Sequence, residues 1–229
     1  MPSPVRRTLL AGPVFDVAPR LLGMVLRRTT EEGTVAVRLT EVEAYDGPND
    51  PGSHAYRGET PRTAVMFGPP GHLYVYFTYG MHFCMNVVAG PDGKPSAVLL
   101  RAGEIIEGID LARERRGFTT LGSAIGAASV STVGEAANPR AKTHPDRDLA
   151  RGPARMCVAL GIGRADNAVD LLGRGSAIQL LPGPGFDGEP VTGPRVGLRE
   201  AADWPWRFSI PGDPTVSPYK PHVPKRRTG

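Results

Sequence analysis

Residues 34–45 alternate between apolar and polar side chains, as expected of a β-strand with one buried face. Because successive side chains of a strand point to opposite faces, the odd-numbered residues are expected to share one face. Those residues are Val35, Val37, Leu39, Glu41, Glu43 and Tyr45. Two carboxylates would therefore point toward the interior or into a cleft. A buried carboxylate without a partner is costly, so this face predicts either a paired structural site or a catalytic one.

Strand and helix signals continue along the chain. The 29 glycines and 24 prolines favour many turns and short elements. Further strands are expected at 71–90, 96–105, 176–182 and 206–212, and helices at 17–28 and 107–117. A last helix is expected within 148–162, with its start near Gly152 and Pro153. Residues 71–90 contain two alternating runs, which predict a β-hairpin with Tyr79–Met81 at its tip. We therefore predict an α+β fold: a mixed or antiparallel curved sheet with surrounding helices and a protruding β-hairpin.

Composition limits the class of protein. The chain of 229 residues suits a single domain, 1–229, with a flexible insertion at 118–145 and a basic flexible tail at 218–229. It shows no signal peptide and no membrane-spanning run, so a cytoplasmic protein is expected. Cys84 and Cys157 are expected to be reduced and buried, and no metal-ligand cluster is visible. The net charge of +4 permits an anionic partner.

Three motifs occur in a specific order: "EAYDGP" from Glu43, "LYVY" from Leu73 and "YGMHFCMN" from Tyr79. With "ARGPARMCVALGI", "GPRVGL" and "WRFSIPG" further on, the chain resembles the alkyladenine (3-methyladenine) DNA glycosylase family. The resemblance implies a monofunctional base excision repair enzyme without cofactor, metal or lyase activity. Such an enzyme flips a damaged purine out of double-stranded DNA, hydrolyses its N-glycosidic bond and leaves an abasic site.

The resemblance also implies catalytic roles. Glu43 would activate the attacking water and stabilise a transition state like an oxocarbenium ion. Arg101 would position that water, and the backbone carbonyl of Val196 would provide another contact to it. Glu41 would be a structural partner of an arginine or of a backbone N–H. The substrates implied are 3-methyladenine, 7-methylguanine, hypoxanthine and ethenoadenine.

A base pocket follows from the same resemblance. Tyr45 and Tyr76 would stack on the flipped purine and His54 would hydrogen-bond to it. Asn86 would disfavour the 2-amino group of normal guanine. Tyr74 shares a strand face with Tyr76 and is expected to support the core.

Contacts to the duplex are expected around this pocket. Tyr79 would fill the gap left by the flipped base, with Met81 supporting it. The candidates for contacts to the DNA backbone are Arg57, Thr60, Arg62 and Arg155. The partner would be duplex DNA bound by a monomer, and the protein would be nucleoid-associated if its source is bacterial.

Two other readings remain open. A non-catalytic damaged-DNA-binding protein would keep the tyrosines and the basic residues, but it would not need Glu43 and Arg101 together. A glycoside or nucleoside hydrolase acting on small molecules would not need a wedge hairpin, and nucleoside hydrolases use aspartate clusters with calcium. The joint presence of Glu43 and Arg101 favours the DNA glycosylase.

Overall fold

The computed structural model describes residues 4–78, 80–118 and 145–221. Its strands are β1 (Val25–Thr30), β2 (Gly33–Tyr45), β3 (Leu73–Thr78), β4 (His82–Ala89), β5 (Ser96–Glu107), β6 (Ile178–Leu181), β7 (Val191–Gly193) and β8 (Arg207–Ser209). Its α-helices are α1 (Arg7–Leu10), α2 (Val14–Arg20), α3 (Ile109–Arg115) and α4 (Pro153–Leu160). The predicted α+β class is confirmed.

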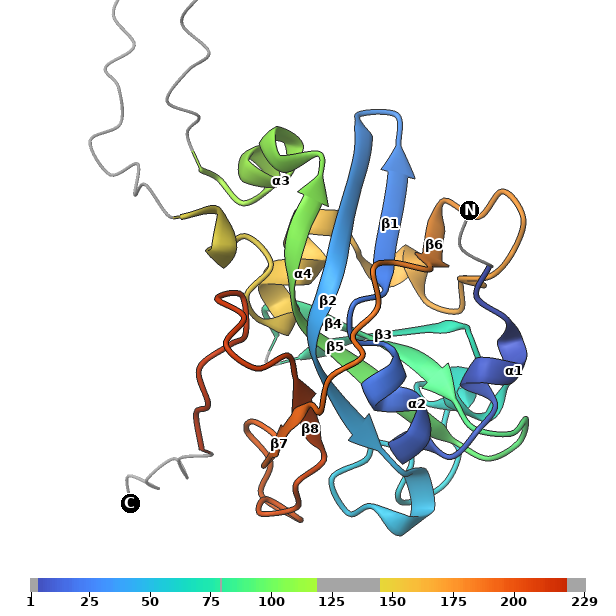
Figure 1. Cartoon of the computed structure of the whole chain (residues 1–229). Helices are drawn as coiled ribbons and strands as arrows, with labels where there is room; N and C mark the ends of the chain where they lie inside the picture. The colour runs from blue at the N-terminus through green and yellow to red at the C-terminus, as the bar shows by residue number, and fades with distance from the viewer. Residues whose placement is uncertain (1–3, 79, 119–144, 222–229) are drawn as a thin grey trace, which may run out of the picture.

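The strands form one curled antiparallel sheet around β2 (Figure 1). The order is β3-β4-β5-β2-β1-β6, and the short strand β8 pairs with both β2 and β7. Side chains from α2, α4 and the central strands build the main core. A second, smaller core cluster contains Ala55, Met66, Tyr74, Val88 and Ala97, and it supports the candidate site described below.

β2 is interrupted by a β-bulge at Thr40. In its pairing with β5, Leu39 lies opposite Gly103 but Glu41 lies opposite Ala102, which leaves Thr40 as the extra residue. A bulge of this kind reverses the alternation of side chains. Before the bulge the main core takes odd-numbered residues of β2, and after it the main core takes Val42 and Ala44. The prediction that the odd positions share one face throughout is therefore wrong, and Glu41 and Glu43 leave the main core.

The prediction of a helix at 17–28 is also wrong for the second half of that range. α2 ends at Arg20, and residues 25–30 are the strand β1. Between them, Gly23 has a φ of 77°, and a Cβ there would lie 2.2 Å from the carbonyl oxygen of Gly185. Only glycine allows this close turn, which reverses the chain into the sheet.

Other predicted elements are found with shifted ends. The strands at 34–45 and 96–105 are β2 and β5, and the helix at 107–117 is α3. The helix expected to start near Gly152 and Pro153 is α4, which begins at Pro153 as predicted. β3 and β4 pair antiparallel with Thr78 opposite His82, while the protruding hairpin stays a prediction. Tyr79 lies outside the described residues, as does most of the predicted insertion and tail (119–144 and 222–229).

Both cysteines are free and buried, as predicted. Across the part of the chain that the structure describes, no helix has the length and apolar character needed to cross a membrane.

Candidate active site

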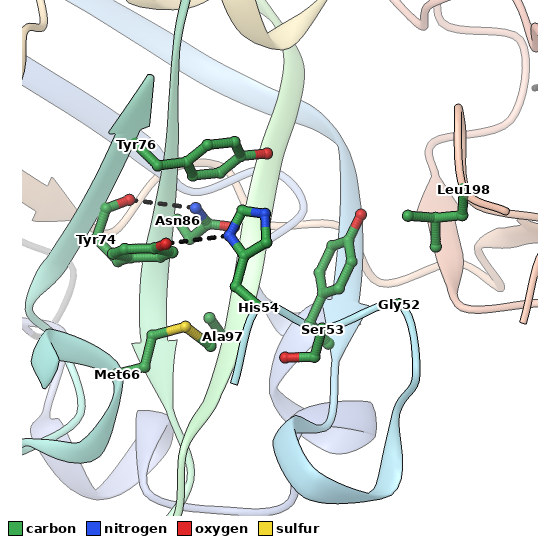
Figure 2. A pocket seen from close by; sticks show the side chains of 10 residues that line it. Gly52, Ser53, His54, Met66, Tyr74, Tyr76, Asn86, Ala97 and Leu198 are labelled. Atoms are coloured by element: carbon green, nitrogen blue, oxygen red, sulfur yellow. Dashed lines mark hydrogen bonds between the residues drawn. The ribbon is translucent and has the colours of Figure 1, made fainter. Parts of the chain in front are cut away.

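A pocket opens where the end of β2, the following loop, and strands β3, β4 and β5 meet the loop before β8 (Figure 2). It contains about 380 Å³ of unfilled space, part of it open to solvent. The lining residues are Tyr45, Gly52, Ser53, His54, Met66, Tyr74, Tyr76, Asn86, Ala97 and Leu198. The structure thus brings together all four residues expected in a base pocket.

Aromatic rings form the pocket walls. Tyr74 and Tyr76 lie two residues apart on β3, so their side chains share a face. Their rings are stacked with centroids 5.6 Å apart, and the His54 ring meets Tyr76 edge-on at 4.6 Å. Tyr74 belongs to the second core cluster, as expected, but it also lines the pocket. Sequence reasoning assigned it only the structural role.

His54 is held in the neutral state. Arg62 Nη2 lies 2.8 Å from its Nε2 and 3.0 Å from its Nδ1, and Nδ1 also lies 3.0 Å from the Tyr74 hydroxyl. An arginine can only donate and a neutral imidazole has one acceptor nitrogen, so one of the two ring nitrogens accepts from Arg62. Partial removal from water of a ring that stays more than a third exposed, then the charge of Arg62, lowers the pKa of His54 to about 4. The imidazole at the pocket is therefore uncharged at neutral pH.

Asn86 lines the pocket, and Arg62 contacts two of the other lining residues. The Asn86 side chain on β4 is buried, and its Nδ2 donates to the Tyr74 carbonyl at 3.2 Å, which fixes the amide (Figure 2). The Arg62 guanidinium carbon lies 5.5 Å from the Tyr76 ring centroid. Arg62, expected to contact the DNA backbone, thus packs against His54 and Tyr76 of the pocket wall.

Glu43 lies directly behind Tyr45. Its carboxylate is fully buried and accepts hydrogen bonds from the Tyr45 hydroxyl and the Val196 backbone N–H, both at 2.8 Å. Arg101 Nη1 lies 3.3 Å away. Val196 was expected to contact the water through its carbonyl, whereas the structure shows its N–H donating a hydrogen bond to Glu43. The three groups of the predicted catalytic set therefore meet, although Glu43 is not part of the pocket lining.

Glu41 is a structural anchor. It accepts from Arg101 Nε and Arg207 Nη1, each at 3.1 Å, and from the backbone N–H and hydroxyl of Ser217 at 2.7 and 3.0 Å. The expected arginine and backbone N–H are both present, so that prediction is confirmed. Arg207 and Ser217 had no signal in the sequence, because they lie far from Glu41 along the chain.

The surroundings of Arg101, Tyr45 and Tyr76 determine whether each side chain is charged. Burial alone would lower the pKa of Arg101, but Glu43 and then Glu41 raise it above its ordinary value. The guanidinium therefore stays charged between the two carboxylates. Burial, then the charge of Glu43, raises the pKa of Tyr45 well above its ordinary value. Burial, then Cys84, does the same for Tyr76. Both rings are thus neutral phenols that can stack on a flat aromatic ligand.

The remaining residues expected to contact DNA are dispersed. Arg57 and Thr60 are exposed on the loop after His54, where Thr60 also bonds to Thr63. Met81 is 68% exposed between β3 and β4. Arg155 is exposed on α4, and its charge lowers the pKa of Arg116 after the larger effect of burial. It is not among the residues that line the pocket.

Sequence reasoning missed a buried ion pair at the site. Arg195 and Asp50 are 145 positions apart and contact each other behind Tyr45. No spacing rule could have joined them. Within the described ranges 4–78, 80–118 and 145–221, no group of three or more histidine, cysteine or acidic residues could hold a metal ion.

Comparisons with known proteins agree on one family. The family model described as "Methylpurine-DNA glycosylase (MPG)" matches residues 8–214. A relative from Streptomyces avermitilis, named as a candidate 3-methyladenine DNA glycosylase, is 51% identical over 98% of this chain and 96% of its own length. A relative of the same name from Leifsonia xyli subsp. xyli is 50% identical over 96% of this chain and 94% of its own.

Proposed function

This chain belongs to the methylpurine-DNA glycosylase family, and we propose that it excises alkylated and deaminated purines through a water activated at Glu43. Family membership makes it a DNA repair enzyme, a hydrolase that acts on the N-glycosidic bond of DNA. The proposed substrates are 3-methyladenine, 7-methylguanine, hypoxanthine and ethenoadenine in duplex DNA.

One observation carries the proposal. Tyr45 lines the aromatic pocket with its ring and donates its hydroxyl to the Glu43 carboxylate at 2.8 Å. A purine stacked on this ring would bring its sugar toward Glu43. The arrangement supports a pocket for the base with a buried negative charge directly behind it.

In the proposed hydrolysis, one bond forms at the sugar C1′ as another breaks. Water oxygen forms a bond to the sugar C1′, the C1′–N bond breaks, and the base leaves with that electron pair. Glu43 accepts the proton from water, and its charge stabilises the positive charge that develops on the sugar. Arg101 stays protonated and holds the carboxylate in place. A cationic methylpurine leaves as a neutral base, which makes it a good leaving group.

The side chains that line the pocket would select the base. Stacking on aromatic side chains contributes roughly 1–3 kcal/mol per base, and electron-rich rings also attract a cationic purine. Neutral His54 would hydrogen-bond the base edge through a ring nitrogen that Arg62 or Tyr74 contacts in the unbound pocket, and the fixed Asn86 amide would crowd the 2-amino position of guanine. To reach this pocket the nucleotide must leave the helical stack, so we include base flipping, with Tyr79 and Met81 as the wedge.

The duplex is held through its phosphates in this proposal. Arg57, Thr60, Arg62 and Arg155 are the candidate contacts, and the net charge of +4 favours approach to DNA. The enzyme acts as a monomer, because one chain supplies every residue of the proposed site. Since its substrate is DNA, it works at the nucleoid in a bacterial cell.

The test is release of bases from four duplexes, each with one of the proposed lesions, and from an undamaged duplex. Alkali then converts abasic sites into strand breaks. Release from damaged duplexes only, with breaks appearing only after alkali, supports a monofunctional glycosylase. Binding to damaged duplexes without any release would replace it with a protein that only binds damaged DNA.

A further inference from the structure

We propose that Arg195 and Asp50 form a positioning pair, which orients Tyr45 and Val196 on Glu43 and thereby sets the rate of base release. This inference rests on the proposed glycosylase function. Neither residue lines the pocket, and neither would touch the substrate. Their effect would pass through the residues that they hold.

The pair is fully enclosed. Arg195 is 1% exposed and Asp50 is 0% exposed. Arg195 Nη2 donates to Asp50 Oδ1 at 2.7 Å, and Nη1 donates to the other carboxylate oxygen. Two parallel hydrogen bonds of this kind fix the guanidinium plane relative to the carboxylate.

The guanidinium joins three segments of the site. Nη1 also donates to the carbonyl of Ala44, at 2.9 Å, and the guanidinium carbon lies 4.5 Å from the Tyr45 ring centroid. The next residue along the chain, Val196, donates its N–H to Glu43. Asp50 in turn accepts from the Gly52 N–H at 2.9 Å, in the loop that leads to His54. One ion pair thus links the end of β2, the His54 loop and the Val196 loop.

Stability alone does not account for this arrangement. A buried ion pair is on average no more stabilising than apolar side chains of the same size, because both charges lose their hydration. Arg195 Nε is buried and has no hydrogen-bond acceptor among the described residues, which adds a further penalty. What the pair does provide is fixed geometry, and catalytic rates are sensitive to displacements of about 1 Å.

Gly52 shows how tightly the three segments meet. A Cβ at this position would lie 2.9 Å from Arg195 Nη2 and 2.8 Å from Leu198 Cδ1. Gly52→Ala would therefore press on both the Arg195 guanidinium and the Leu198 side chain without removing either charge. It offers a second way to disturb the pair.

The experiment compares wild type with Arg195→Lys, Asp50→Asn and Gly52→Ala. Lysine keeps the charge but cannot make the paired hydrogen bonds. We measure the single-turnover rate of base release, affinity for the lesion duplex, and Tm. For Arg195→Lys and Asp50→Asn, positioning predicts that release slows by about 10²-fold while affinity stays within about twofold, because only the chemical step depends on the alignment. Gly52 lines the pocket, so for Gly52→Ala positioning predicts the slower release alone.

The control is Asp166→Asn, which breaks the partly buried ion pair with Arg28 away from the pocket. If its Tm falls by as much as that of the Arg195 and Asp50 variants, Asp166→Asn should still release the base at the wild-type rate. Wild-type rates in the three variants, or an equal loss in the control, would overturn the positioning role. If Asp50→Asn does not fold, Arg195→Lys decides the question, because Arg195 does not line the pocket. A wild-type protein that releases no base would instead refute the proposed function itself.

Discussion

Replacing Tyr45 with phenylalanine tests the contact between pocket and carboxylate without removing the ring. The Tyr45 hydroxyl donates to Glu43 at 2.8 Å, and Glu43 is fully buried. Tyr45→Phe leaves this charge with one donor fewer, and a hydrogen bond to a charged group contributes about 1.5–3 kcal/mol. Since 1 kcal/mol shifts Tm by about 2–4 °C in a chain of this size, Tm should fall by about 3–12 °C.

Thermal unfolding at pH 7, followed by circular dichroism, measures this shift. Tyr56→Phe is the matched control, because Tyr56 is 46% exposed and its hydroxyl has no partner in the described part of the chain. The control should keep the wild-type Tm. A change of less than about 1 °C in Tyr45→Phe would refute the claim that this hydroxyl stabilises a buried charged carboxylate.

Three further predictions concern single residues. The folded-state pKa of His54, about 4, lies below its ordinary value of 6.5, so its neutral form adds stability that is present above pH 6.5 and lost as pH falls toward 4. The Tm advantage of wild type over His54→Asn should therefore shrink across that range in a pH series of melting curves. Arg101→Met leaves two buried carboxylates without their shared cation, and breaking such a pair costs about 3–5 kcal/mol, which should lower Tm by about 6 °C or more. An unchanged Tm would contradict this. Arg57→Gln should reduce the slope of log affinity against log salt by about 0.9 if Arg57 binds one phosphate, whereas Arg174→Gln, at another exposed arginine, should leave the slope unchanged.

The sequence predicted the central strand but not its irregularity. Alternation from residue 34 to 45 is a strong local signal, and β2 follows it. The bulge at Thr40 depends on pairing with β5, which is a partner distant in sequence. Without the bulge, Glu43 would point into the apolar core. The feature that turns this residue out of the main core, toward Tyr45 and Arg101, could therefore not be predicted from the local pattern.

Long-range polar contacts were equally hidden. Glu41 was expected to find an arginine or backbone partner, but its contacts to Arg207 and Ser217 exist only because the C-terminal segment returns to β2. The pair of Arg195 and Asp50 is another example. Residues of the base pocket were named from motif resemblance, and the fold brings them together. Their chemical roles stay predictions.

The most direct test of the account is the single-turnover rate of base release by wild type and by Glu43→Gln, on a duplex with one ethenoadenine or hypoxanthine. Glu107→Gln, the same change at an exposed strand end, is the control. Loss of a general base predicts a fall of about 10²–10⁴-fold in Glu43→Gln, with duplex binding retained and the control unchanged. A folded Glu43→Gln protein that releases the base at the wild-type rate would contradict the central claim.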